Sequence, residues 1–302
     1  MKSKELRSLG IKLLSLIFVL VGISCGQKTS ESTSGDNGEE FVQAESQVKD
    51  QIETVVFDIP SPSEIPFLLE ATGAEFNESL LNDINKADSY AVTNDVAAIN
   101  LGVYSADIGY LISYDKVQEA LNYLTSTKDL ADHLGVTGSV NVELLKRFEG
   151  NLANKDSLAF ILDQAITETD SFLKDDNRNR MAALLIVGSF VEGLYISTEL
   201  IRSYPKNLLP EDSRILVLTP LMRVILEQEK SLDDLLSLLN TIEQVNPVGQ
   251  IKDDLLTIQA LYKELNITEQ IENSRPDLVI TDKTLSSITK KVAAVRKSLV
   301  DL

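Results

Sequence analysis

The residues most capable of chemistry are two acids, Asp107 and Glu192, each set among polar side chains at helical spacing. Asp107 shares one helix face with Asn100, Tyr104 and Tyr114. Such a face can either carry a buried polar site or supply hydrogen bonds to backbone groups and solvent. The sequence alone leaves both readings open.

The second acid has a similar setting. Glu192 shares a helix face with Ser189 and Glu199, and Tyr195 lies beside it. If the two helices pack together, one carboxyl group from each could meet among tyrosines, as ligand sites in bundle cores do. A buried acid with a raised pKa is a candidate site, although structural ion pairs perturb acids as well. The candidate ligand-binding residues are Tyr104, Asp107, Glu192 and Tyr195.

The other possible motifs are incomplete. His133 is the only histidine and Cys25 the only cysteine, which excludes His-based triads, multi-His or Cys-based metal sites and intrachain disulfides. Ser287 and Lys290 match a Ser-x-x-Lys motif that lacks its partner motifs. A calcium-loop pattern beginning at Asp175 has Arg180 where glycine is required. We therefore predict no catalytic residues, no metal and no cofactor, while an acid/base hydrolase using the two acids stays open.

Helical patterns must position these residues. Pro60, Pro62 and Pro66 indicate an irregular entry, and a helical pattern begins at residues 67–69. Asp115 with Gln118 indicates a capping box. Pro220 is expected to kink its helix, and residues 246–249 are expected to form a turn. The expected helices span residues 94–114, 115–134, 142–152, 156–176, 178–204, 211–245, 251–265 and 284–300. Short connections predict antiparallel neighbours.

Two of these helices are expected at the centre. Residues 181–196 are apolar nearly all round, which indicates a buried core helix rather than a membrane span. The helix at 94–114 carries a face of small residues, which allows close approach of another helix. That face consists of Ala98, Gly102, Ser105, Gly109 and Ser113. We therefore expect an all-α fold, a single bundle of about eight antiparallel-packed helices over residues 56–302.

The N-terminus has the layout of a bacterial lipoprotein signal. Basic residues precede an apolar run at residues 13–21, which is too short to span a bilayer, and small residues lead to Cys25. Residues 22–25 resemble a lipobox, although Gly22 stands where leucine is usual. The sequence predicts a signal peptide at 1–24 and a palmitate-bearing lipid anchor on Cys25; the alternative is a plain signal peptide.

The remaining chain is strongly acidic. The formal charge is −18, and residues 1–24 carry a net +3, so the mature chain is at −21 (−18 minus 3). Such a surface repels phosphate backbones, which excludes nucleic acid as a partner. Residues 25–55 are rich in Ser, Thr, Gly and Glu and are expected to form a flexible acidic linker. Gly26 follows the cysteine, at the position where enterobacterial lipoproteins retained in the inner membrane carry Asp. By analogy this favours the outer membrane, with the periplasmic or surface face unresolved.

Three stretches carry a resemblance to a known family. They are INLGVYSADIGYL (Ile99–Leu111), ELLKRFEGNLANKDSL (Glu143–Leu158) and GSFVEGLYISTEL (Gly188–Leu200). They resemble a family of all-helical lipoproteins of Bacteroidota, and the likeness spans most of the chain after residue 55. That family has no assigned reaction, so the resemblance implies no catalytic residue. Its recognisable segments contain Tyr104, Asp107, Glu192 and Tyr195.

The sequence favours a membrane-anchored envelope lipoprotein that is a non-enzymatic accessory or binding subunit with an envelope protein partner. The alternative is a small-molecule-binding module that uses a polar pocket around Asp107 and Glu192 in the bundle core.

Overall fold

The structure is a computed structural model, and it describes residues 64–71, 73–136, 139–175, 178–203, 228–265 and 283–301. These residues are mostly helical, and no strand occurs among them. The predicted all-α fold is confirmed. The signal, Cys25 and the linker lie outside the described residues, as do Pro60, Pro62, Pro220 and residues 176–177 of the calcium-loop pattern.

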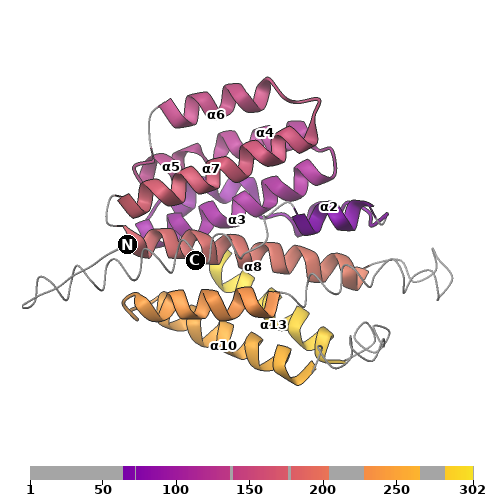
Figure 1. Cartoon of the computed structure of the whole chain (residues 1–302), viewed down its shortest axis with the longest axis vertical. Coiled ribbons are helices and arrows are strands. Elements are labelled where there is room, and N and C mark those ends of the chain that lie inside the picture. Colours follow the sequence, from indigo (N-terminus) through magenta and orange to yellow (C-terminus); the bar gives the residue numbers. More distant parts are fainter. Residues whose placement is uncertain are drawn as a thin grey trace, which may run out of the picture. The chain divides into compact units, whose positions relative to one another are not determined.

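The helices follow one another with short connections (Figure 1). Residues 228–241 form a further helix whose start is not described. The elements are α2 (Glu64–Ala71), η1 (Glu78–Leu80), η2 (Ile84–Tyr90), α3 (Asn94–Ser113), α4 (Val117–Ser126), α5 (Lys128–His133), α6 (Ser139–Glu149), α7 (Lys155–Asp175), α8 (Asn179–Ser203), α10 (Val248–Leu265) and α13 (Lys283–Val300).

α3 and α8 form the centre and make the most extensive contact between described elements. A Cβ atom on Gly102 would lie 2.0 Å from the carbonyl oxygen of Leu185, and one on Gly188 would lie 2.0 Å from that of Ile99. The two backbones can approach this closely only because both positions are glycine. The predicted small-residue face is therefore a contact face at Gly102, and Gly188 is its counterpart.

The two central helices run parallel. Near their N-terminal ends, Asp95 of α3 pairs with Arg180 of α8 at 2.7 Å between Oδ2 and Nη2. The glycine contacts follow further along both helices in the same order. The antiparallel expectation holds for neighbours joined by short connections, and α3 and α8 are separated by four other helices. The central pair therefore differs from the predicted antiparallel packing.

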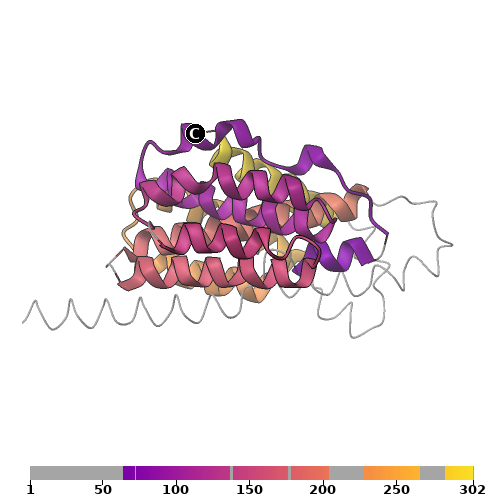
Figure 2. The same cartoon turned by 90° about the horizontal axis from the view of Figure 1, so that it is seen from above.

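The other helices pack on the central pair (Figures 1 and 2). α4, α5 and α7 contact α3, and α6 packs against α4 and α7. α13 contacts α8, α3 and α10. Buried aliphatic side chains from α3, α8, residues 228–242, α10 and α13 form the main core cluster. A second cluster joins the end of α3 to α4, α6 and α7.

Local signals explain several helix ends. Thr93 caps α3, because its side chain accepts a hydrogen bond from the backbone N–H of Val96 at 3.3 Å. The capping box at Asp115 is wrong. Asp115 has a φ of 57°, and Lys116 precedes α4 without a side-chain cap. The expected single helix at 115–134 is also divided, since α4 ends at Ser126 and α5 begins at Lys128.

Other boundaries differ by a few residues. α6 begins at Ser139 rather than residue 142, and α10 begins at Val248, inside the stretch predicted as a turn. The 3-10 helices η1 and η2 were not predicted. Their local caps are the side chains of Asn77 and Asp83, which accept from backbone N–H groups two residues later.

α3 and α8 are the two described helices that are long and apolar enough to cross a membrane. Within the most apolar window of each, 89% of α3 and 78% of α8 is buried inside the protein. This burial is typical of core helices in a bundle, as expected for residues 181–196.

Candidate functional site

Asp107 and Glu192 meet inside the bundle. Each lies thirteen residues after the first residue of its helix, Asn94 in α3 and Asn179 in α8. Because the helices run parallel, these equivalent positions come together, close enough for the negative charge of Glu192 to act on Asp107. Both side chains are fully buried. The structure therefore brings together the two acids of the predicted site.

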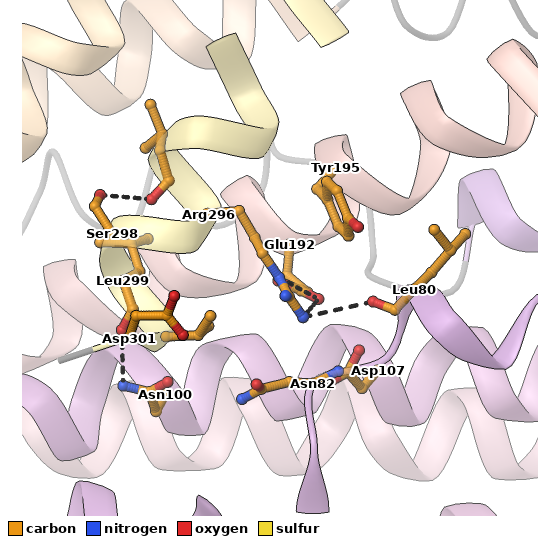
Figure 3. A network of polar contacts seen from close by, with 12 residues as sticks. Leu80, Asn82, Asn100, Asp107, Glu192, Tyr195, Arg296, Ser298, Leu299 and Asp301 are labelled. Carbon is orange, nitrogen blue, oxygen red and sulfur yellow. Dashed lines mark hydrogen bonds and ion pairs between the residues drawn. The ribbon is translucent and has the colours of Figure 1, made fainter. Parts of the chain in front are cut away.

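A guanidinium from the C-terminal helix closes the acid pair (Figure 3). In α13, Arg296 Nε donates to Glu192 Oε2 at 2.9 Å, and Nη2 donates to Oε1 at 3.0 Å. Arg296 also lies over the ring of Tyr195, 4.9 Å from the centroid, in a cation–π contact. Two parallel N–H···O bonds are the strongest form of Arg–carboxylate contact. Glu192 is thus held as the ionised partner of Arg296.

Asp107 keeps the proton of the pair. Burial, and then the negative charge of Glu192, raise the pKa of Asp107 well above its usual range. Burial also raises the pKa of Glu192, against the opposing effect of Arg296. Oδ1 of Asp107 receives no N–H or O–H bond within the described part of the chain. A proton on Asp107 donated to Glu192 leaves one carboxylate facing one guanidinium, which is the cheapest charge state to bury.

The same side chains hold the segment Asn77–Asp83, which contains the short 3-10 helix η1 and which we call the strap. Asp107 Oδ2 accepts from the backbone N–H of Asn82 at 3.2 Å, and Arg296 Nη2 contacts the carbonyl of Leu80 at 3.5 Å (Figure 3). The hydroxyl of Tyr104 donates to the carbonyl of Asp83 at 2.8 Å.

Two further tyrosines hold the strap. Tyr123 of α4 donates to the carbonyl of Asn82 at 2.9 Å, and the Tyr110 hydroxyl accepts from the backbone N–H of Asn77 at 2.8 Å. The strap lacks long helical hydrogen bonding, so these side chains satisfy backbone groups that are costly to bury unpaired.

Polar side chains of α3 and η2 also hold the end of α13. The side-chain amide of Asn100 donates to the carbonyl of Leu299 at 3.3 Å (Figure 3). The hydroxyl of Tyr90 donates to the carbonyl of Val300 at 2.7 Å, and Lys86 Nζ donates to the same carbonyl at 3.3 Å. The last carbonyls of a helix have no partner within it, so these donors stabilise the helix end.

Tyr114 and Glu199, which belong to the two polar helix faces, lie apart from the acid pair. Tyr114 packs with Phe76 and Tyr110, at centroid distances of 5.7 and 5.0 Å. Glu199 pairs with Arg202 in the same helix. Of the predicted ligand-binding residues, Asp107, Glu192 and Tyr195 gather around Arg296, and Tyr104 holds the strap.

Sequence reasoning missed Arg296. Its signal was present, because the buried residues Val292 and Val300 lie four positions before and after it. A basic residue on the apolar face of a helix needs an acidic partner.

Other motifs gather no chemistry. His133 and Ser287 are exposed, and Lys290 is exposed on α13. Within the described ranges, no group of three or more His, Cys, Asp or Glu side chains is placed to hold a metal ion.

The acid pair is arranged as a structural contact inside the protein, which we call the internal fastening. The carboxyl groups contact the chain's own guanidinium and backbone, and they join α3, α8, α13 and the strap. Comparison of the chain with protein-family models, with curated proteins and with solved structures finds no match.

Proposed function

We propose that the protein is a membrane-anchored lipoprotein of the bacterial envelope whose helical domain serves as a non-enzymatic accessory or binding subunit. The anchor rests on the sequence before Cys25, where basic residues, a short apolar run and small residues precede the cysteine. The linker that follows gives the domain reach from the membrane surface.

One observation supports the non-enzymatic role most directly. The best acid/base candidates, Asp107 and Glu192, have no exposed surface, and Glu192 is bonded through both oxygens to Arg296. A general acid or base must come within hydrogen-bond reach of the group it protonates or deprotonates. In this arrangement the acids reach the protein's own chain instead, so they contribute to holding the subunit together.

The charge of the mature chain favours one kind of partner. A surface at −21 steers association with basic surfaces and opposes close contact with anionic headgroups. We therefore propose an envelope protein that presents a basic face to the domain while the lipid holds the chain at the membrane.

The anchor is tested by metabolic labelling with an alkyne-bearing palmitate. We expect the wild-type chain to be labelled and to sediment with membranes. Cys25→Ser should lose both properties, and the linker variant Thr33→Ala should keep both. An unlabelled wild-type chain, or a labelled Cys25→Ser chain, would contradict the anchor.

The partner is tested by crosslinking native envelopes, purifying the tagged lipidated protein and identifying neighbours by mass spectrometry. We expect a stoichiometric protein neighbour that dissociates as the salt concentration rises, because charge steers the contact. A protein that purifies alone as a monodisperse monomer, with no crosslinked neighbour, would contradict the accessory role.

A further inference from the structure

A small cavity of about 60 Å³ lies away from the acid pair, among α3, α4, α5, α6, α7 and α8. Its apolar wall includes Leu101, Leu162 and Leu185. Lys128 stands at its edge, with a side chain that is 41% exposed. Protein interiors contain few voids larger than a water molecule. A space of this size has room for about four water molecules, and its wall is mostly unsuited to them.

Small side chains leave this space open. Ala131 of α5 and Ala165 of α7 line it where a leucine would fill it, and Ser105 of α3 belongs to the small-residue face of that helix. The cavity thus exists because several helices carry small side chains there, and not because of a gap at one helix end.

The polar atoms of the wall select the kind of ligand. The hydroxyl of Ser105 donates to the carbonyl of Leu101 at 2.8 Å, and that of Thr169 donates to the carbonyl of Ala165 at 2.8 Å. Thr127 donates to the carbonyl of Leu124 at 3.1 Å. A hydroxyl whose proton is already donated can only accept another hydrogen bond. The cavity wall therefore offers acceptors to a ligand that carries a donor.

Charge restricts the ligand further. Lys128 is paired with Asp132, so the edge of the cavity is close to neutral. An ammonium ligand would be repelled by Lys128, which lines the cavity. A carboxylate gains little from a lysine that is already paired with Asp132, and it has no proton to donate to the wall. A neutral hydroxyl group meets both conditions, because it donates to the threonine or serine oxygens and accepts from an ammonium.

We propose that this cavity is a binding site for a small neutral ligand, a branched aliphatic chain of about four carbons that carries one hydroxyl group. The aliphatic part packs against the leucines, and the hydroxyl bonds to an acceptor of the wall. Small ligand sites of this kind are mostly apolar with a few polar groups that fix orientation.

The probe is isobutanol, compared with isobutyrate and isobutylammonium, titrated into the full chain at low millimolar concentrations. Binding is followed by methyl NMR shifts. We expect saturable binding of isobutanol with a dissociation constant in the millimolar range, since a ligand of about five non-hydrogen atoms gains little contact. The two charged analogues should bind at least tenfold more weakly. Absence of saturable isobutanol binding, or equal binding of either charged analogue, would overturn the proposal.

Variants locate the site. Ala165→Leu fills the cavity and should abolish isobutanol binding, while Ala260→Leu, on the exposed face of α10, should leave it unchanged. Ala131→Leu serves as a second filling variant if Ala165→Leu does not fold. Unchanged isobutanol affinity in a folded filling variant would show that the alcohol binds elsewhere and would overturn the site.

Discussion

Asp107 and Glu192 lie side by side with different charges. Glu192 carries the negative charge that balances Arg296, and Asp107 is the neutral acid, which accepts a hydrogen bond from the strap at Asn82. A neutral amide can replace a neutral acid, whereas nothing replaces the carboxylate opposite a guanidinium. The two acids should therefore respond differently to the same kind of substitution.

At pH 4.5 we expect Asp107→Asn to change the free energy of unfolding by less than about 1 kcal/mol, because the amide can donate to Glu192 and accept from Asn82. Glu192→Gln should lower the free energy of unfolding by about 3 kcal/mol or more, since it leaves Arg296 with a partner that has no charge. Urea denaturation of the two variants measures both. Equal losses would contradict the assignment of the proton to Asp107.

The raised pKa of Asp107 predicts a pH dependence of stability. The folded state holds this proton more tightly than the unfolded chain does, because burial and then Glu192 raise the pKa. Stability from this group is therefore complete below the unfolded pKa of about 4 and is lost as the pH rises toward the folded pKa, by up to about 1.4 kcal/mol per pH unit.

The measurement is urea denaturation of wild type and Asp107→Asn at several pH values from 4.5 to 8. The wild type should lose stability relative to the variant as the pH rises. Exposed acids with lowered pKa values, Asp83 and Asp301, lose their contribution as the pH falls, and both chains share them. Parallel curves for the two chains would show that Asp107 does not hold the proton.

At the scale of elements, the crossing of α3 and α8 depends on glycine. A Cβ on Gly188 would meet the backbone of Ile99, which cannot move aside as a flexible side chain can. Gly193, one turn and a half further along α8, has nothing within 4 Å of its Cβ position. The two glycines therefore provide a matched pair in one helix.

Gly188→Ala should lower the free energy of unfolding by about 3 kcal/mol, at the upper end for overpacking. Gly193→Ala should raise it by about 0.5–1 kcal/mol through helix propensity. Thermal or urea denaturation distinguishes the two signs. A Gly188→Ala protein as stable as wild type would contradict the close contact of the central helices.

Helix periodicity predicted most elements, because the pattern of apolar residues is local. The capping box at Asp115 failed because that residue ends α3 in the left-handed conformation instead of starting α4. The backbone N–H of Lys116 then donates to the carbonyl of Leu111 at 2.9 Å, as in a Schellman motif. The division between α4 and α5 at Thr127 has no proline or glycine to announce it.

At the scale of the whole molecule, the sequence predicted the all-α fold and the meeting of the two acids but not how they meet. Asp107 and Glu192 are 85 positions apart (192 minus 107), as are Asp95 and Arg180 (180 minus 95), and only the parallel arrangement of α3 and α8 brings both pairs together. Arg296 lies a further hundred residues along the chain, so no local pattern names its partner.

Apolar packing, an ion pair and hydrogen bonds together hold α13 against the rest of the domain. Its apolar residues pack in the main core, Arg296 enters the acid pair, and Asn100, Tyr90 and Lys86 bind its last carbonyls. An internal fastening of this kind predicts that loss of the Glu192 charge loosens α13 and the strap more than the helices on the far side of α3.

Hydrogen exchange of backbone amides in Glu192→Gln tests this contact most directly, with Glu199→Gln as the control because Glu199 pairs with Arg202 of the same helix. We expect at least tenfold faster exchange in α13 and in the strap of Glu192→Gln, equivalent to about 1.4 kcal/mol of local stability. Exchange in α6 and α7 should be unchanged. The control should match wild type throughout. Unaltered exchange in α13 of Glu192→Gln would show that the acid pair does not hold α13 in place. The pair would then be a candidate ligand site.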